Sequence, residues 1–153
     1  MSLIATGGTT EPVIIANAPF FPDIDLDAFR ETMRVDNTVS DERAVHALET
    51  AMSDVNGQLS TWMQNQVDAG AASIHDVQQP AWQPDGYHIR LYLRAVFSLA
   101  KANLIERYRD YDTTGTGHDK ADALAPADDD YRRDAAWAIA DMRGEQRTTI
   151  ELI

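Results

Sequence analysis

The sequence predicts an all-α protein: a bundle of about four helices with an extended N-terminal arm and a β-like C-terminal tail. Three observations predict this fold class. Apolar residues recur every three to four positions in four segments, which is the helical period. Capping residues or glycines bound these segments. The two ends of the chain lack the helical period. We therefore expect an arm over residues 1–24, a helical domain over 25–144 and a tail over 145–153.

The arm is predicted from the prolines and glycines that interrupt residues 1–24. Phe20 and Phe21 stand near its end. Large apolar side chains are seldom left in water, so this end of the arm is expected to pack on something. A short helix is predicted next, over residues 25–35, with Asp25 as N-cap.

The second helix is predicted over residues 40–70, with Ser40 as N-cap and Gly70 as the glycine that ends it. Its apolar residues are spaced alternately by three and four positions, which forms a heptad-like stripe. The stripe consists of Val45, Leu48, Met52, Val55, Leu59, Trp62 and Val67. It fits either a bundle within the chain or a coiled coil with another chain. The presence of further helices favours packing within the chain.

Residues 71–86 predict a loop that contains Trp82, which is either a lid on the core or a contact for a partner. The third helix is predicted over residues 87–111. Its broad apolar face marks it as the central helix. Arg90, Arg94 and Lys101 lie close together on its helical wheel. This basic stripe fits either a carboxylate-rich partner or a solvated face with local ion pairs.

A polar, glycine-containing loop is predicted over residues 112–126, with a short turn near 120–124, before a fourth helix over 127–143 and Gly144. The tail that follows changes character, because β-branched residues and alternation replace the helical period. Its last residues are Thr148, Thr149, Ile150, Glu151, Leu152 and Ile153. A single strand in a helical protein has no internal partner. It is therefore either a frayed end or a segment that pairs with another chain.

The composition excludes several classes of protein. The 153 residues include 25 Asp and Glu against 13 Lys and Arg, which gives a net charge of −12. Such a chain has no general basic surface for nucleic acid or for anionic lipid. The absence of cysteine excludes disulfide scaffolds and thiol catalysis. The sequence also predicts neither a membrane span nor a signal peptide.

Residues 110–121 imitate a calcium-binding EF-hand loop without completing it. Asp110, Asp112 and Thr114 stand at loop positions one, three and five. The twelfth position, where a bidentate glutamate would complete the coordination, is Ala121. We therefore expect a polar loop between helices here.

The remaining acids and histidines give no catalytic pattern. The histidines His46, His75, His88 and His118 lack the spacing of zinc motifs. The acidic run at residues 128–130 is explained by the dipole at the start of the fourth helix. The alternative among enzymes is a metal-dependent enzyme built on Asp110, Asp112 and Asp128 to Asp130. We expect no catalytic residue, no metal and no cofactor.

The segment PFFPDIDLDAFRETMRVDNTVS resembles the N-terminal signature of the head-completion protein (GpL type) family of temperate, contractile-tailed phages. The resemblance covers about residues 18–145. The segments FFPDID and ERYR are its most specific parts. The matching positions are Phe20 to Asp25, Met33-Arg34, Ala69-Gly70, Arg94 to Val96, Glu106 to Arg109, Lys120 to Asp122, Trp137-Ala138 and Gly144.

This resemblance implies a structural virion protein that is made in the host cytoplasm. Such proteins are head–tail connector adaptors that dock as a ring of twelve copies on the portal protein. They stabilise the DNA-filled head and meet the next neck or tail-terminator protein. The resemblance implies neither catalytic residues nor contact with a membrane. The alternative is a small helical binding or chaperone-like module that uses the stripe between Val45 and Val67.

Three expectations follow for an adaptor of this kind. The tail from Thr148 to Ile153 is expected to bind the portal by strand addition. Phe20 and Phe21, and the basic stripe of Arg90, Arg94 and Lys101, are the candidates for contacts with a neighbouring subunit. Twelve copies with a net charge of −12 each would carry a formal charge of −144. An acidic channel of this kind would let DNA pass without specific binding.

Overall fold

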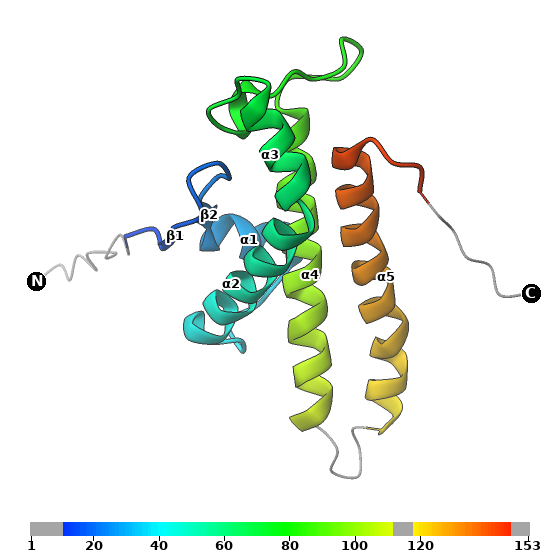
Figure 1. The fold of residues 1–153 in the computed structure, drawn as a ribbon. Coiled ribbons are helices and arrows are strands. Elements are labelled where there is room, and N and C mark those ends of the chain that lie inside the picture. The colour runs from blue at the N-terminus through cyan, green and yellow to red at the C-terminus, as the bar shows by residue number, and fades with distance from the viewer. Residues whose placement is uncertain (1–10, 112–117, 148–153) are drawn as a thin grey trace, which may run out of the picture.

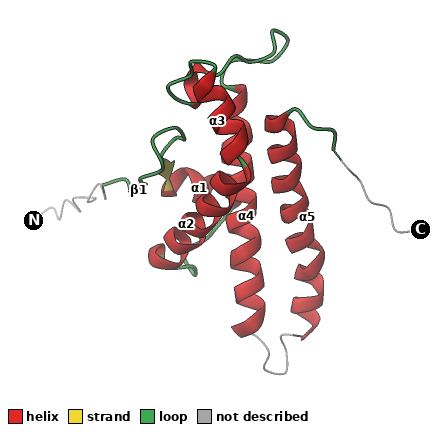
Figure 2. Ribbon diagram, in the orientation of Figure 1, coloured by secondary structure: helices red, strands yellow, loops and turns green. Residues whose placement is uncertain are grey.

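The structure, a computed structural model, describes the backbone of residues 11–111 and 118–147 and the side chains of 11–107 and 127–147. Within these ranges the fold is mainly helical, as predicted. Two long helices, α4 (Tyr87–Tyr111) and α5 (His118–Arg143), lie side by side and run in opposite directions (Figure 1). The shorter helices lie on the other side of α4: α1 (Leu26–Met33), α2 (Asp41–Gln58), α3 (Ser60–Asp68) and the 3₁₀ turn η1 (Ile74–Asp76) (Figure 2).

The described part of the arm is extended, and it pairs with itself. Strand β1 (Ile14–Ile15) pairs antiparallel with β2 (Ile24–Asp25), and Ile15 lies opposite Ile24. Between the two strands the chain turns inward, so that Phe20 and Phe21 are only 6% and 5% exposed. The prediction that this end of the arm packs on something is confirmed. Its partner is the core of the same chain.

The predicted N-cap of the first helix is confirmed. The Asp25 carboxylate accepts hydrogen bonds from the backbone N–H groups of Asp27 (2.9 Å) and Ala28 (3.4 Å). These amides begin α1 and have no partner within the helix. The cap therefore fixes the point at which the arm passes into the helical body.

We expect Asp25→Ala to lower the free energy of unfolding by about 1 kcal/mol, because the first amides of α1 lose their acceptor. Urea denaturation measures this change. Glu31→Ala is the matched control, since Glu31 is an exposed acid of the same helix outside the cap. An equal loss in both variants would contradict a specific role for the cap.

The predicted helix over residues 40–70 is wrong in one respect, because it is divided at Leu59 into α2 and α3. Leu59 has φ −94° and ψ 1°, outside the helical range. The Ser60 hydroxyl donates to the carbonyl oxygen of Gly57 (2.8 Å), and such back-bonding bends helices. The apolar spacing continues through Leu59, so the stripe alone gave no sign of the break. The two predicted ends are confirmed: Ser40 caps α2, and Gly70 follows α3 with φ 103°.

The apolar stripe packs within its own chain, and not in a coiled coil with another chain, as the presence of further predicted helices favoured. Leu48, Val55 and Leu59 are completely buried, and Met52 is 5% exposed. Helix α4 has the predicted bounds and contacts α1, α2, η1 and α5, so it is the central helix. The core therefore lies around α4, with the arm, α1 and α2 on one side and Ala138, Ile139 and Met142 of α5 on the other.

The predicted start of the fourth helix is wrong. Helix α5 begins at His118, nine residues before the predicted start at 127, and includes the segment expected to form a loop. The loop was predicted from the polar, glycine-containing composition of residues 112–126. From His118 onward the backbone is helical instead, and the helix continues through Pro126 although proline removes one helical hydrogen bond. At the other end Gly144 has φ 69°, as a glycine that follows a helix should. No helix in the described ranges is both long and apolar enough to cross a bilayer.

Candidate interaction surfaces

A closed triangle of hydrogen bonds holds the arm to the helical body. Asn17 of the arm donates to the Tyr92 hydroxyl of α4 (2.7 Å), and that hydroxyl donates to Asn56 of α2 (2.7 Å). Asn56 then donates to the side-chain oxygen of Asn17 (2.9 Å). Tyr92 is completely buried, so its hydroxyl depends on Asn17 and Asn56 for its hydrogen bonds. The arm is thus attached by specific contacts at this point.

Phe20 and Phe21 pack next to this attachment. The Phe21 ring stacks on Tyr92 with centroids 4.8 Å apart, and the Phe20 ring meets Trp62 edge-on at 6.0 Å. Both aromatic rings therefore make most of their contacts within their own chain. The contact of these residues with a neighbouring subunit stays a prediction.

The burial of Tyr92 makes stability depend on pH in a defined range. Burial raises the pKa of Tyr92 to about 12, although the hydrogen bonds with Asn17 and Asn56 lower it in part. An unfolded tyrosine has a pKa of about 10. Below pH 10 both states are neutral, so stability is complete. Between pH 10 and 12 only the unfolded state ionises, and we expect about 3 kcal/mol to be lost.

Tyr92→Phe removes this pH dependence. We expect the variant to be less stable at neutral pH by about 1–3 kcal/mol, because Asn17 and Asn56 lose a buried partner. Its stability should then fall less steeply than that of the wild type above pH 10. Urea denaturation of both proteins across this range measures the difference, because the other tyrosines titrate in both. Parallel curves would contradict the assignment.

The three basic residues of the predicted stripe all contact groups of their own chain. Arg90, Arg94 and Lys101 meet, in that order, the carbonyl oxygens of Asp85 and Pro84, the carboxylate of Asp134 (2.6 Å) and the carbonyl oxygen of Arg34 (3.5 Å). These contacts favour the interpretation of a solvated face with local pairs. A contact of the stripe with a neighbouring subunit stays a prediction.

The start of the C-terminal tail is anchored by a side chain that the sequence did not single out. Arg147 folds back on the end of α5 and binds both carboxylate oxygens of Asp141 (3.0 and 2.5 Å). Its guanidinium lies 5.3 Å from the Trp137 ring centroid, and that of Arg133 lies at 5.1 Å. Arg133, Trp137 and Asp141 are four residues apart, so they lie on one face of the helix. This spacing is the sequence feature that could have indicated a binding place for Arg147. Residues 148–153, predicted to bind the portal, lie outside the described residues.

The candidate metal ligands divide into two groups. Residues 112–117 and the side chain of Asp110 lie outside what the structure describes. In the acidic run, Asp128 pairs with Arg132 (3.3 Å) and Asp130 with Arg133 (2.7 Å), as local pairs on α5. In the described part of the chain, three or more His, Asp or Glu side chains nowhere gather closely enough to hold a metal ion.

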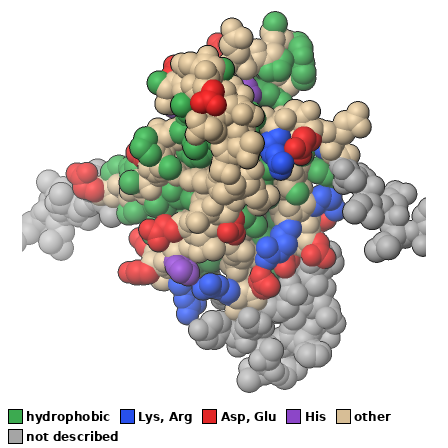
Figure 3. Space-filling view, viewed as in Figure 1, with side chains coloured by type: hydrophobic (Ala, Val, Ile, Leu, Met, Phe, Trp, Pro, Cys, Tyr) green, Lys and Arg blue, Asp and Glu red, His purple; other side chains and the backbone are tan. Residues whose placement is uncertain are grey.

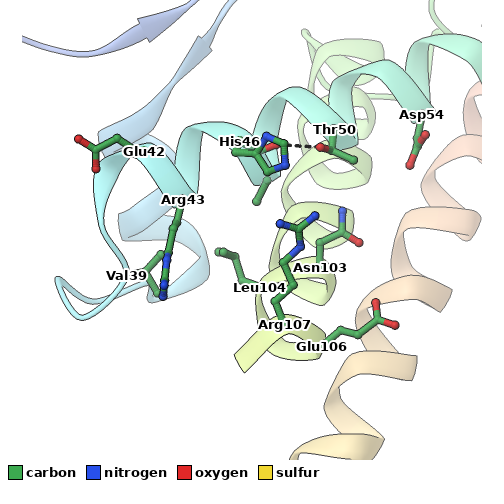
Figure 4. Close-up of a pocket in the computed structure, with 11 residues that line it drawn as sticks. Val39, Glu42, Arg43, His46, Thr50, Asp54, Asn103, Leu104, Glu106 and Arg107 are labelled. Carbon is green, nitrogen blue, oxygen red and sulfur yellow. Dashed lines mark hydrogen bonds between the residues drawn. The ribbon is translucent and has the colours of Figure 1, made fainter. Parts of the chain in front are cut away.

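Two surface features remain. Trp82 is 77% exposed, so it is not a lid on the core. Hydrophobic side chains gather at the upper end of the molecule in Figure 3, and the loop before α4 lies at this end in Figure 1. The second feature is a groove of about 420 Å³ between α2 and the second half of α4 (Figure 4). Its lining residues come from segments distant in sequence, so no local sequence pattern indicates the groove.

Comparisons with known proteins agree with the resemblance. The sequence pattern of the family described as phage head completion protein (GPL) matches residues 15–153. The head completion/stabilization protein of Escherichia phage P2 is 39% identical over 145 residues, which cover 94% of this chain and 84% of that protein. The probable head completion/stabilization protein of Haemophilus phage HP1 (strain HP1c1) is 23% identical over 146 residues, 94% of both chains. No solved structure matches the chain.

The names of these relatives describe structural proteins and not enzymes. The match to the family covers the described body of the fold, from β1 through α5, and extends over the tail. By this match and the 39% identity, the chain belongs to the phage head completion protein (GPL) family.

Proposed function

We propose that this protein is a head-completion adaptor, copies of which form a ring under the portal at the head–tail junction. As a member of the head completion family it is a structural component of the virion. The observation that carries the proposal is the family match over residues 15–153. The ring stabilises the DNA-filled head and provides the platform for the next neck or tail-terminator protein.

Several features of the fold suit this role. An adaptor needs a rigid body and ends that reach neighbouring rings. Helices α4 and α5 supply the body, and the pairs Arg94–Asp134 (2.6 Å) and Arg132–Glu106 (2.5 Å) join them. Arg147 holds the start of the tail to α5, so the segment beyond it leaves from a fixed point. The net charge of −12 per copy fits a channel through which DNA passes without specific binding.

The proposal is tested on DNA-filled heads made without this protein. We expect such heads to lose DNA and to remain without tails, and the purified chain to restore both properties. The readouts are retained DNA and infectious particles after purified tails are added. Full tail attachment to heads that lack the chain would contradict the proposal.

The alternative, a chaperone-like module, needs the stripe from Val45 to Val67 to be free. Most residues of the stripe are buried. Its most exposed residue is Val67, at 43%. A module of this type would have to unfold its own core to bind a partner helix. We therefore retain the adaptor as the proposed function.

A further inference from the structure

The loop before α4 presents Trp82 on a braced support. The Gln79 side chain donates to the carbonyl oxygens of Gln83 and Pro84 (both 3.0 Å) and accepts from the backbone of Tyr87 (3.4 Å). From α4, Arg90 donates to the carbonyl oxygen of Pro84 at 3.1 Å. These bonds hold the backbone of the loop that carries Trp82, so the loop loses little conformational freedom when the exposed ring binds a partner, which favours its use as an anchor. Tryptophan is also the residue type most enriched among such anchors.

The groove between α2 and α4 has the chemistry to receive an indole ring. Val39, Ala47 and Leu104 supply apolar surface. Figure 4 shows the Arg107 side chain pointing from α4 into the groove towards α2. Its guanidinium forms no hydrogen bond or ion pair with any residue that the structure describes. Elsewhere in the chain a guanidinium already packs on an indole, since Arg133 lies 5.1 Å from the Trp137 ring centroid.

Charge in and near the two features is also complementary. Asp85 lies three residues after Trp82, and within the described ranges its carboxylate has no partner, so it is available to Arg107. The groove also contains Glu106, whose charge is already paired with Arg132 (2.5 Å). Its other two acids, Glu42 and Asp54, lie at opposite ends of the lining in Figure 4, with Arg107 between them.

The two features cannot meet within one chain. Leu104 of the groove follows Tyr87, the first residue of α4, by seventeen positions. At 1.5 Å per residue this places the groove about 25 Å along the helix from the Trp82 loop. A contact between them must therefore join two copies, and it uses different surfaces on each. Head-to-tail contacts of this type form a ring when the rotation from one copy to the next closes.

We propose that Trp82 of one copy inserts into the α2–α4 groove of the next copy, with Asp85 paired to its Arg107. This inference rests on the proposed ring and names the contact that forms it. The proposed occupant of the groove is a second copy of this chain. A peptide of the portal, or the tail of a neighbour, is a different occupant and is separated from this one by the tests below.

The first test is the affinity between copies, measured by the mass of portal-bound assemblies as a function of concentration. Trp82→Ala should weaken the contact about thirtyfold or more, as an anchor residue would. Asp85→Arg and Arg107→Asp should each weaken it, and the charge-swapped double variant should recover most of the loss. Ile14→Ala is the control and should leave it unchanged, because Ile14 is another exposed large apolar side chain (53%) that belongs to neither the loop nor the groove. Equal assembly of wild type and Trp82→Ala would overturn the inference.

The second test uses the absence of cysteine from the chain. Copies with Ala81→Cys are mixed with copies with Thr50→Cys on the portal and mildly oxidised. Ala81 adjoins Trp82 and is exposed, and Thr50 lines the groove. We expect a covalent heterodimer from this pair. Glu49→Cys, about 100° further round α2, is the control and should give none.

The outcomes separate the two proposals. If copies bind the portal and no Ala81–Thr50 crosslink forms, the inference is overturned while the adaptor function stands. If the crosslink forms equally with Glu49→Cys, the groove is not the docking site and the inference is again overturned. If copies do not bind the portal at all, the proposed function fails, and the ring contact fails with it.

Discussion

Phe21→Ala is expected to lower the free energy of unfolding by about 3–5 kcal/mol, the usual cost of truncating a buried phenylalanine. Phe21 is 5% exposed, and its ring stacks on Tyr92 at 4.8 Å and meets Phe20 edge-on at 5.2 Å. The truncation leaves a cavity beside a buried hydroxyl whose partners, Asn17 and Asn56, lie on two other elements. The arm and α2 should therefore loosen together.

Urea denaturation and amide hydrogen exchange check this prediction. Ile14→Ala is the matched control, because Ile14 belongs to the same arm and is 53% exposed. We expect the control to change stability by less than about 0.5 kcal/mol. If Phe21→Ala were as mild as Ile14→Ala, the arm would not be part of the core in solution.

This burial changes how the neighbour contact of Phe20 and Phe21 must be tested. A double alanine variant would lose assembly through unfolding alone. Phe20→Leu keeps an apolar side chain in the core and removes only the ring contacts with Phe21 and Trp62, so it is the milder variant. Wild-type assembly of Phe20→Leu would remove Phe20 as a contact with a neighbouring subunit.

Deletion of residues 148–153 is expected to abolish portal binding and leave the helical fold intact. The segment is rich in β-branched residues, with Thr148, Ile150 and Leu152 alternating with Thr149, Glu151 and Ile153. It therefore suits addition to an exposed strand through main-chain hydrogen bonds. The deletion spares Arg147 and its pair with Asp141, so the end of α5 keeps its own contacts. Circular dichroism and thermal unfolding should therefore match the wild type.

A point variant makes the same test without shortening the chain. Ile150→Pro removes one backbone donor and should weaken portal binding strongly, since proline is excluded from paired strand positions. Ile150→Val keeps the donor and the β-branched shape, and should bind like the wild type. Unchanged portal binding by the deletion would show that the tail is not the anchor.

The sequence predicted most of the helical body because its signals there are local. Helix α4 has a wide apolar face and matched its predicted bounds. Asp25, Ser40 and Gly144 act through neighbouring backbone groups, so single residues were enough to place those ends.

The predictions failed where the structure depends on contacts between elements that are distant in sequence, or on a single hydrogen bond. The polar composition of residues 112–126 suggested a loop, although α5 begins at His118 and packs along α4 over a long contact. The division at Leu59 coincides with the hydrogen bond from Ser60 to Gly57, which an apolar spacing pattern cannot reveal. The groove depends on residues that α2 and α4 bring together only in the folded chain.

The most direct test of the account is cryo-electron microscopy of the intact head–tail junction. The account predicts twelve copies of this helical fold in one ring under the portal, with carboxylates lining the channel and Trp82 of each copy in the groove of the next. It is contradicted if the protein is found elsewhere in the particle, or if the portal contacts the next neck protein directly.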